Sequence, residues 1–150
     1  MDEVEKPRQH APETLARRLI RGCDRAVLST SLTDGGWPYG SLVMTACDHA
    51  AKPLLLISGL AEHSKNIDKD SRASLLFDGT GGLDSPLTGA RVTVLGTLSR
   101  TGDPALAARY LARHPESQMF AGFDDFAFYE MSVTRAHIVA GFGVIHWFDA

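Results

Sequence analysis

Three residues that could bind a phosphate group follow one another in the middle of the chain: His63, Ser64 and Lys65. They come shortly after an apolar run over residues 54–58, in a stretch whose composition predicts a short polar helix over residues 61–69. A helix that begins where a strand ends presents free backbone N–H groups and the positive end of its dipole to an anion. A hydroxyl and two potential cations at that point predict a phosphate site, and the alternative is an ordinary solvated helix start.

Other residues with suitable chemistry lie elsewhere in the sequence. Arg91 belongs to a stretch whose alternate positions are apolar, so it is either a ligand contact or an exposed charge on a sheet. Trp147 follows His146 near the end of the sequence, where the two rings either cover a ligand or pack without one. Short side chains among residues 39–46 would let a flat aromatic ligand lie against a strand, although they also suit a tightly packed sheet.

Several classes of enzyme find no support in the sequence. It contains neither the G-x-S-x-G motif of serine hydrolases nor the H-E-x-x-H motif of zinc proteases. Cys23 and Cys47 form no C-x-x-C pair and have no histidine at zinc-finger spacing, so we expect reduced packing residues and no metal site. The 6 histidines show no distinctive spacing.

The composition indicates one globular domain. A chain of 150 residues buries roughly 70% of the surface that its unfolded form exposes, which is enough for a core without metal or disulfide. The net charge of −3 provides no basic field that would attract nucleic acid. Without an apolar leader or a run of ~20 apolar residues, the expected compartment is the cytoplasm. We expect a mobile N-terminal tail over residues 1–11 and a single domain over residues 12–150.

The apolar pattern predicts an α+β domain built on an antiparallel sheet or closed barrel, because mostly hairpin-connected strands are interrupted by three helices. The predicted helices cover residues 12–22, 61–69 and 103–113. Seven segments have a strand pattern and make up six or so strands of the sheet: residues 25–32, 39–46, 54–58, 73–77, 90–99, 129–134 and 136–141.

Three blocks of the sequence together resemble the FMN-binding split barrel of the pyridoxamine 5′-phosphate oxidase-like superfamily. The blocks are Pro38-Tyr39-x-Ser41-x-Val43, residues 54–77 and Arg91-Val92-Thr93-Val94-Leu95-Gly96. The resemblance implies a six-stranded antiparallel split β-barrel with flanking helices, and a homodimer that binds FMN at its interface. It also implies that the strand from Ser41 faces the flavin ring and that Ser58 joins the phosphate site. With Trp147, the aromatic residue noted above, the predicted FMN contacts are Ser41, Leu42, Val43, Met44, Thr45, Ser58, His63, Ser64, Lys65, Arg91 and Trp147.

The sequence departs from pyridoxamine 5′-phosphate oxidase itself at several of these positions. Ser41 and Ala46 replace a flavin-binding Arg and Lys, and His63 replaces a phosphate-binding Lys, so we do not expect oxidation of the vitamin. A closer resemblance is to the haem-utilisation branch of the superfamily. It rests on residues 84–91, His114-Pro115-x-Ser117, Phe123-x-Asp125-Phe126 and Gly141-Phe142-Gly143.

Three functions follow from these expectations. The first is an FMN-dependent oxidoreductase, in which the cofactor performs the electron transfer and no catalytic side chain is required. The second is a haem-binding or haem-degrading protein, with His63, His137 or His146 as a possible axial ligand. The third is a flavin-binding module without enzymatic activity. No motif indicates a substrate.

Overall fold

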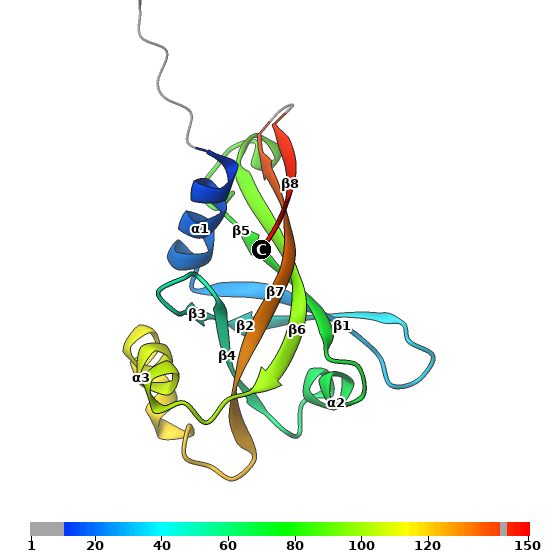
Figure 1. Ribbon diagram of the computed structural model, residues 1–150, viewed down its shortest axis with the longest axis vertical. Coiled ribbons are helices and arrows are strands. Elements are labelled where there is room, and N and C mark those ends of the chain that lie inside the picture. Colours follow the sequence, from blue (N-terminus) through cyan, green and yellow to red (C-terminus); the bar gives the residue numbers. More distant parts are fainter. Residues whose placement is uncertain (1–10, 142–143) are drawn as a thin grey trace, which may run out of the picture.

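An antiparallel sheet with three α-helices forms the part of the chain that the computed structural model describes, residues 11–141 and 144–150 (Figure 1). The helices are α1 (Pro12–Gly22), α2 (Glu62–Lys69) and α3 (Pro104–Arg113). The strands are β1 (Arg25–Ser31), β2 (Pro38–Met44), β3 (Ala46–Cys47), β4 (Pro53–Ser58), β5 (Arg72–Asp78), β6 (Ala90–Arg100), β7 (Phe126–Ala140) and β8 (Ile145–Asp149). The predicted N-terminal tail, Ala11 apart, lies outside the described residues, as do Phe142 and Gly143.

The sheet curls on itself because its two edges belong to one bent segment of chain. The strand order is β2-β1-β5-β6-β7-β4-β3, and β8 pairs with β7. Strand β3 follows β2 after Thr45, whose N–H donates to the carbonyl of Asp24 at 2.9 Å, in register with the ladder between β1 and β2. The result is a half-barrel. Among the described residues the sheet has 8 strands, where the family resemblance implied six. The bend at Thr45 divides the predicted strand 39–46 into β2 and β3, and β8 adds to the edge of β7.

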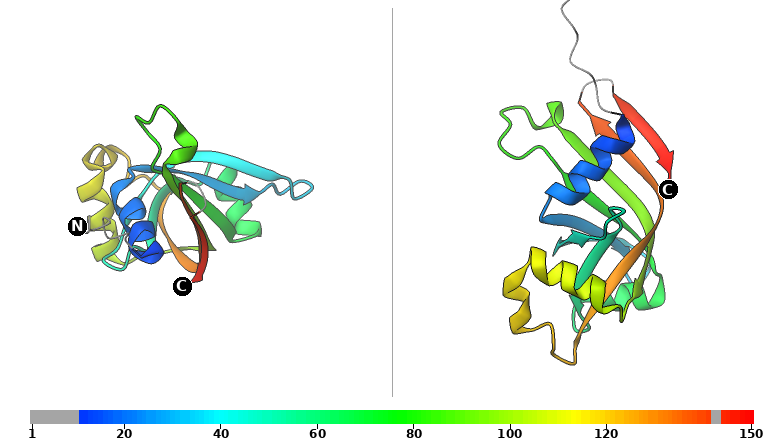
Figure 2. Two further views of the ribbon diagram at one scale, coloured as in Figure 1. Left: turned by 90° about the horizontal axis from the view of Figure 1, so that it is seen from above. Right: turned by 60° about the vertical axis from the view of Figure 1, so that its left-hand side comes forward.

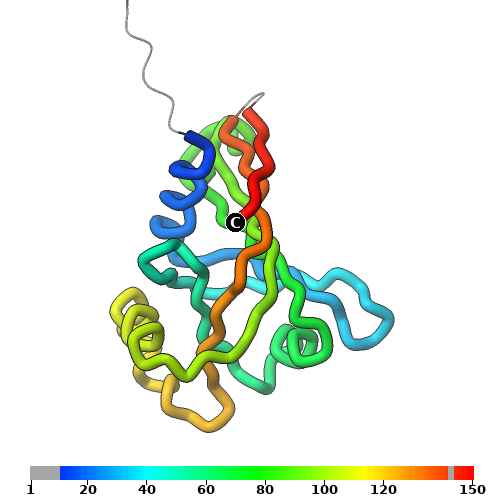
Figure 3. The backbone as a smooth tube through the Cα atoms, viewed as in Figure 1, coloured from blue at the N-terminus to red at the C-terminus, as the bar shows by residue number. Residues whose placement is uncertain are grey.

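Strand β7 corrects another sequence-based expectation. Residues 129–134 and 136–141 were predicted as two strands, but they belong to one strand of 15 residues (Figure 3, orange). The ladder between β6 and β7 shifts register at Leu95 and Gly96, so that Thr134 is an extra residue on β7. Such a bulge interrupts the apolar alternation without ending the strand. A side chain on Gly96 would collide with the backbone of Ser132, so this close approach requires glycine.

The core lies on the inner face of the curled sheet, where alternate residues of each strand point. Its fully buried side chains include Leu28, Leu55, Leu75, Phe77, Val92, Met131 and Ile138. Burying each large apolar side chain contributes roughly 1.5–3 kcal/mol. In β1, for example, Ala26, Leu28 and Thr30 are buried and alternate with more exposed residues.

The helices close the open parts of the barrel. Helix α1 has the predicted bounds and buries Ala16 and Ile20 against the core. Helix α3 begins after Asp103, whose side chain accepts the N–H of Ala105, and buries Tyr110. Both helices lie on the same side of the molecule, whereas α2 lies beside β1 (Figures 1 and 2). Among the described residues, no helix is both long and apolar enough to span a membrane.

Buried Asn66 fixes α2 to the first hairpin. Its amide donates to the Thr30 hydroxyl at 3.1 Å and accepts the N–H of Thr33 at 3.3 Å. Helix α2 and the hairpin between β1 and β2 are therefore held in one arrangement.

Candidate functional site

The outer face of the sheet, opposite the core, carries an unusual row of side chains. The strand register aligns one residue from each of six strands: Leu42 (β2), Val27 (β1), Leu76 (β5), Thr93 (β6), His137 (β7) and Trp147 (β8). Leu42 is 68% exposed and Trp147 is 53% exposed. Exposed apolar side chains gathered on one face mark an interaction or ligand-binding surface. We call these six residues the outer-face row.

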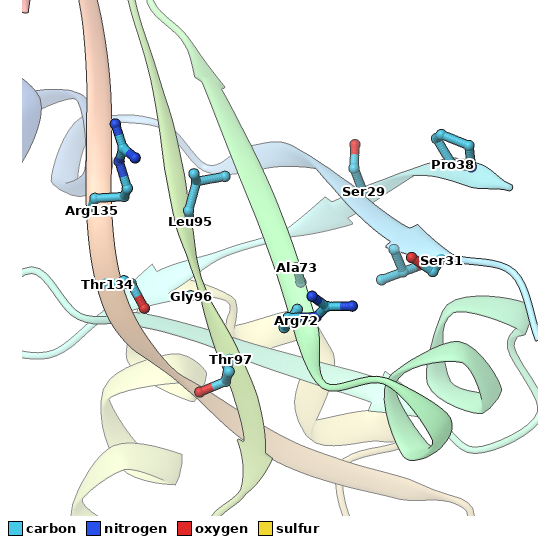
Figure 4. Close-up of a pocket in the computed structure, with 11 residues that line it drawn as sticks. Ser29, Ser31, Pro38, Arg72, Ala73, Leu95, Gly96, Thr97, Thr134 and Arg135 are labelled. Carbon is cyan, nitrogen blue, oxygen red and sulfur yellow. The ribbon is translucent and has the colours of Figure 1, made fainter. Parts of the chain in front are cut away.

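A pocket of about 550 Å³ opens beside this row (Figure 4). Arg135 and Arg72 lie on opposite sides of the pocket, with Leu95 and Gly96 between them. Its other lining residues are mostly small or carry hydroxyl groups: Ser29, Thr30, Ser31, Pro38, Ala73, Thr97 and Thr134. An apolar floor with a few cations and hydroxyls suits a flat ligand that carries negative groups.

The two arginines of the pocket differ in their partners. Arg72 donates two hydrogen bonds to the carboxylate of Asp70, at 2.8 and 3.0 Å. These bonds lower the pKa of Asp70 to about 2, so the pair stays charged at neutral pH. Arg135 lies over the indole of Trp147, with its guanidinium carbon 3.8 Å from the ring centroid. Arg135 is therefore a cation positioned by an aromatic ring and not by a carboxylate.

His137 stands on the same strand face as Arg135, two residues further along β7. Its ring centroid is 4.4 Å from that of Trp147, so the indole contacts both side chains. Within the described residues the ring nitrogens of His137 make no hydrogen bond, whereas Nε2 of buried His114 is 2.7 Å from the carbonyl oxygen of Thr45. His146 pairs with Ile138 and so points to the other side of β8.

The residues predicted to bind phosphate lie at the far end of the sheet, between β4 and α2. Ser58 Oγ donates to Asp125 at 3.2 Å, which places a carboxylate next to it. Burial lowers the pKa of His63, so its imidazole is neutral near pH 7. Ser64 is buried. Lys65 is exposed, with Nζ 3.6 Å from a carboxylate oxygen of Glu62. The predicted helix is present, but only Lys65 of this group presents a charge to solvent.

The FMN contacts predicted on β2 lie on both faces of the sheet. Leu42 and Met44 point outward, whereas Ser41 and Val43 are partly buried on the inner side. Thr45 is fully buried. The hydroxyl oxygens of Ser41 and Thr45 are buried without a hydrogen-bond partner among the described residues. A ligand on the outer face of one chain would contact only the outward pair.

Arg91 and Trp147 lie far from the residues predicted to bind phosphate. Ser58 pairs with Phe126 at the start of β7, whereas Arg91 pairs with Val139 near its end. Thirteen residues of strand separate the two pairs, roughly 40 Å of chain, which is longer than an FMN molecule. Within one chain the predicted FMN contacts therefore form two separate groups. The Arg91 guanidinium donates to the Leu87 carbonyl at 3.1 Å.

Sequence reasoning did not single out Arg72 or Arg135. Each is an isolated arginine on a strand, which ordinarily indicates a solvent-exposed charge. Only the three strands taken together could have indicated these arginines: Arg72 on β5 and Arg135 on β7 point outward on either side of Leu95, which points outward on β6 between them. That signal requires the strand order, which the sequence does not state.

Comparisons with known proteins agree on the fold. The chain is 32% identical over 141 residues to the chloroplastic heme oxygenase HOZ of Arabidopsis thaliana, covering 91% of this chain and 43% of that protein. A heme binding protein from Mycobacterium smegmatis is 27% identical, with a TM-score of 0.87 over 95% of this chain and 59% of that one. The chain thus spans only about half the length of these relatives.

A more distant structure shares the fold alone. A Clostridium acetobutylicum protein described as related to general stress protein 26, of the pyridoxinephosphate oxidase family, is 13% identical, with a TM-score of 0.68 over 91% of this chain and 92% of that one. The split-barrel resemblance is therefore confirmed. The model of the family described as CREG, beta-barrel matches residues 6–150, and the chain belongs to that family, close to the haem-binding split barrels.

Proposed function

We propose that this protein binds haem on the outer face of its sheet. The observation that carries the proposal is the arrangement of Arg135, His137 and Trp147 beside a pocket with an apolar floor. Two relatives, a heme oxygenase and a heme binding protein, support the choice of ligand.

The residues of the outer face match the chemistry of haem in three ways. The macrocycle is flat and apolar, and the exposed side chains of Leu42, Val27 and Leu76 offer it an apolar surface. Its propionates are carboxylates, for which a guanidinium is the best side-chain partner. Its iron accepts an imidazole nitrogen as axial ligand.

Position along β7 favours His137 over the other histidines. Residues two apart on one strand face are roughly 7 Å from each other, so Arg135 and His137 can contact the carboxylate and the iron of the same molecule. His63 is on α2, away from the pocket, and His146 points to the opposite side of β8. When bound, haem supplies the redox-active iron. The chain's own residues hold its carboxylate and exclude water from one of its faces.

The outer face also favours a homodimer. One sheet covers only one side of a flat ligand, and the exposed part of Leu42 continues the apolar surface beyond the pocket. Two-fold dimers are the commonest oligomers, and their interface uses the same patch twice. We propose that a second copy packs on this face, so that the ligand lies between two chains.

FMN remains a second candidate because Lys65 stands exposed at the start of α2. Its neighbours make this the weaker case. Asp125 lies beside Ser58, Glu62 lies beside Lys65, and His63 is neutral, so a phosphate dianion would meet one cation and two carboxylates. In a dimer, Arg91 or Trp147 of the other chain could complete this site.

The test is a haem titration of the purified protein followed by visible absorption. We expect a spectral change that saturates at one haem per chain. His137→Ala should bind haem more weakly and give a different absorption spectrum, whereas the matched control His146→Ala should give the wild-type spectrum. A protein that purifies with a flavin spectrum supports the second candidate. Non-saturable haem binding, or equal effects of the two histidine variants, contradicts the proposal.

A further inference from the structure

A second cavity, of about 450 Å³, lies between α1 and α3 with β3 at its base, and it shares no residue with the pocket on the outer face. Figure 1 and the right-hand view of Figure 2 show β3 between α1 and α3. Three of its six lining residues are arginines, Arg21, Arg109 and Arg113, and the others are Ala46, Cys47 and Ala112. We call this cavity the arginine cleft.

The sequence places the three arginines on one cavity by simple helix geometry. Arg21 lies in the last turn of α1, and Arg113 lies in the last turn of α3. Arg109 and Arg113 are four residues apart on α3, so their side chains share one face of the helix. The small residues Ala46 and Ala112 leave the space between the two helices open.

Each guanidinium is held by a backbone carbonyl group. Arg109 Nε donates to the carbonyl of Cys47 at 2.9 Å, and Arg113 Nη2 donates to that of Gly22 at 3.0 Å. Arg21 Nη2 donates to the carbonyl of His49. A guanidinium has five N–H groups, so each arginine keeps most of its donors for another partner. One hydrogen bond thus tethers each of the three exposed side chains beside the cavity.

None of the three arginines forms an ion pair with a described residue. The carboxylates next to them in sequence have other partners. Asp24 pairs with Arg25 at 2.8 Å, and Asp48 accepts the N–H groups of residues 50 and 52. Three exposed positive charges therefore line one cavity in a protein whose net charge is −3. An anion bound there would interact with all three at once.

We propose that the arginine cleft binds a small molecule that carries at least two phosphate groups. Guanidinium groups match phosphate oxygens in pairs, and three of them suit a ligand with several charges better than a single inorganic phosphate. Burial raises the pKa of the Cys47 thiol, although Arg21 and Arg109 act against this, so the thiol adds no negative charge to the cleft.

Isothermal titration with inorganic pyrophosphate tests the proposal. We expect one site per chain, with affinity about tenfold or more above that for orthophosphate. Arg109→Gln should weaken pyrophosphate binding by about tenfold or more, because it removes a charge-assisted hydrogen bond. The matched control is Arg18→Gln, an exposed arginine of α1 outside the cleft, which changes the net charge equally and should have less than about a twofold effect.

Ala112→Phe provides a variant that fills the cleft without changing any charge, and it should also abolish binding. ADP in place of pyrophosphate shows whether a nucleoside diphosphate can occupy the site. The proposal is overturned if pyrophosphate does not bind, if Ala112→Phe binds it like the wild type, or if Arg18→Gln weakens it as much as Arg109→Gln does. Haem titration of the same variants should be unchanged, which separates this site from the outer face.

Discussion

Replacing Arg135 by glutamine should weaken haem binding by removing one partner of a propionate. Arg135 has no carboxylate partner among the described residues and lies over Trp147, so its charge is available to a ligand. A hydrogen bond to a charged group contributes roughly 1.5–3 kcal/mol, which corresponds to about a tenfold to hundredfold loss of affinity. The substitution also removes the contact between the Arg135 guanidinium and the Trp147 ring. Because that contact is present both with and without haem, its loss does not alter the expected change in haem affinity.

The assay compares haem with haem dimethyl ester, in which both carboxylates are blocked. Arg135→Gln should weaken haem by the full amount and the ester hardly at all, whereas the control Arg18→Gln should affect neither. An equal loss for haem and ester would show that the substitution acts on the fold or the stack and not on a propionate. An unchanged affinity for haem would remove Arg135 from the site.

Three further predictions concern other parts of the molecule. Leu42→Glu should weaken the proposed dimer by roughly a hundredfold in sedimentation equilibrium, because a charge would be buried in the interface. The control Leu60→Glu, at an exposed leucine between β4 and α2 outside the outer-face row, should not. Lys65→Glu should weaken FMN about tenfold or more while leaving riboflavin unchanged, if FMN binds at α2; equal effects on both would remove the phosphate from that helix. Burial raises the pKa of Tyr110 to about 12, so the folded state retains a proton that the unfolded state loses above its ordinary value of 10.0. The contribution of Tyr110 to the free energy of unfolding should therefore be fully present below pH 10 and fall by about 2–3 kcal/mol as the pH rises to 12. Urea unfolding of Tyr110→Phe should lack this fall. An identical fall in the variant would refute the assignment.

Local signals in the sequence were sufficient for the helices and most strands. Helix α3 follows from an Asp103 cap and a proline at its first position, and α1 has its predicted bounds because its apolar face and its proline agree. The single strand β7 could not be foreseen. Its bulge at Thr134 breaks the alternation that a strand normally shows, and only the partner strand β6 reveals that the ladder continues.

The candidate site was less accessible to sequence reasoning than the fold. The sequence singled out Trp147 and named His137 as one of three candidate axial ligands. Their contact, and the place of Arg135 beside them, appear only when β8 folds back on β7. Arg72 joins the pocket from β5, about 60 residues away in sequence. Pockets on a sheet depend on strand order and register, which are properties of the whole chain rather than of any motif.

The central claim is that two copies of the chain hold haem between their outer faces. Sedimentation velocity of the haem-loaded protein, detected both in the protein band and in the haem band, tests it most directly. The account predicts that the haem absorbance sediments with a dimer, at one haem per chain. Haem that sediments with a monomer, or that does not sediment with the protein, would contradict it.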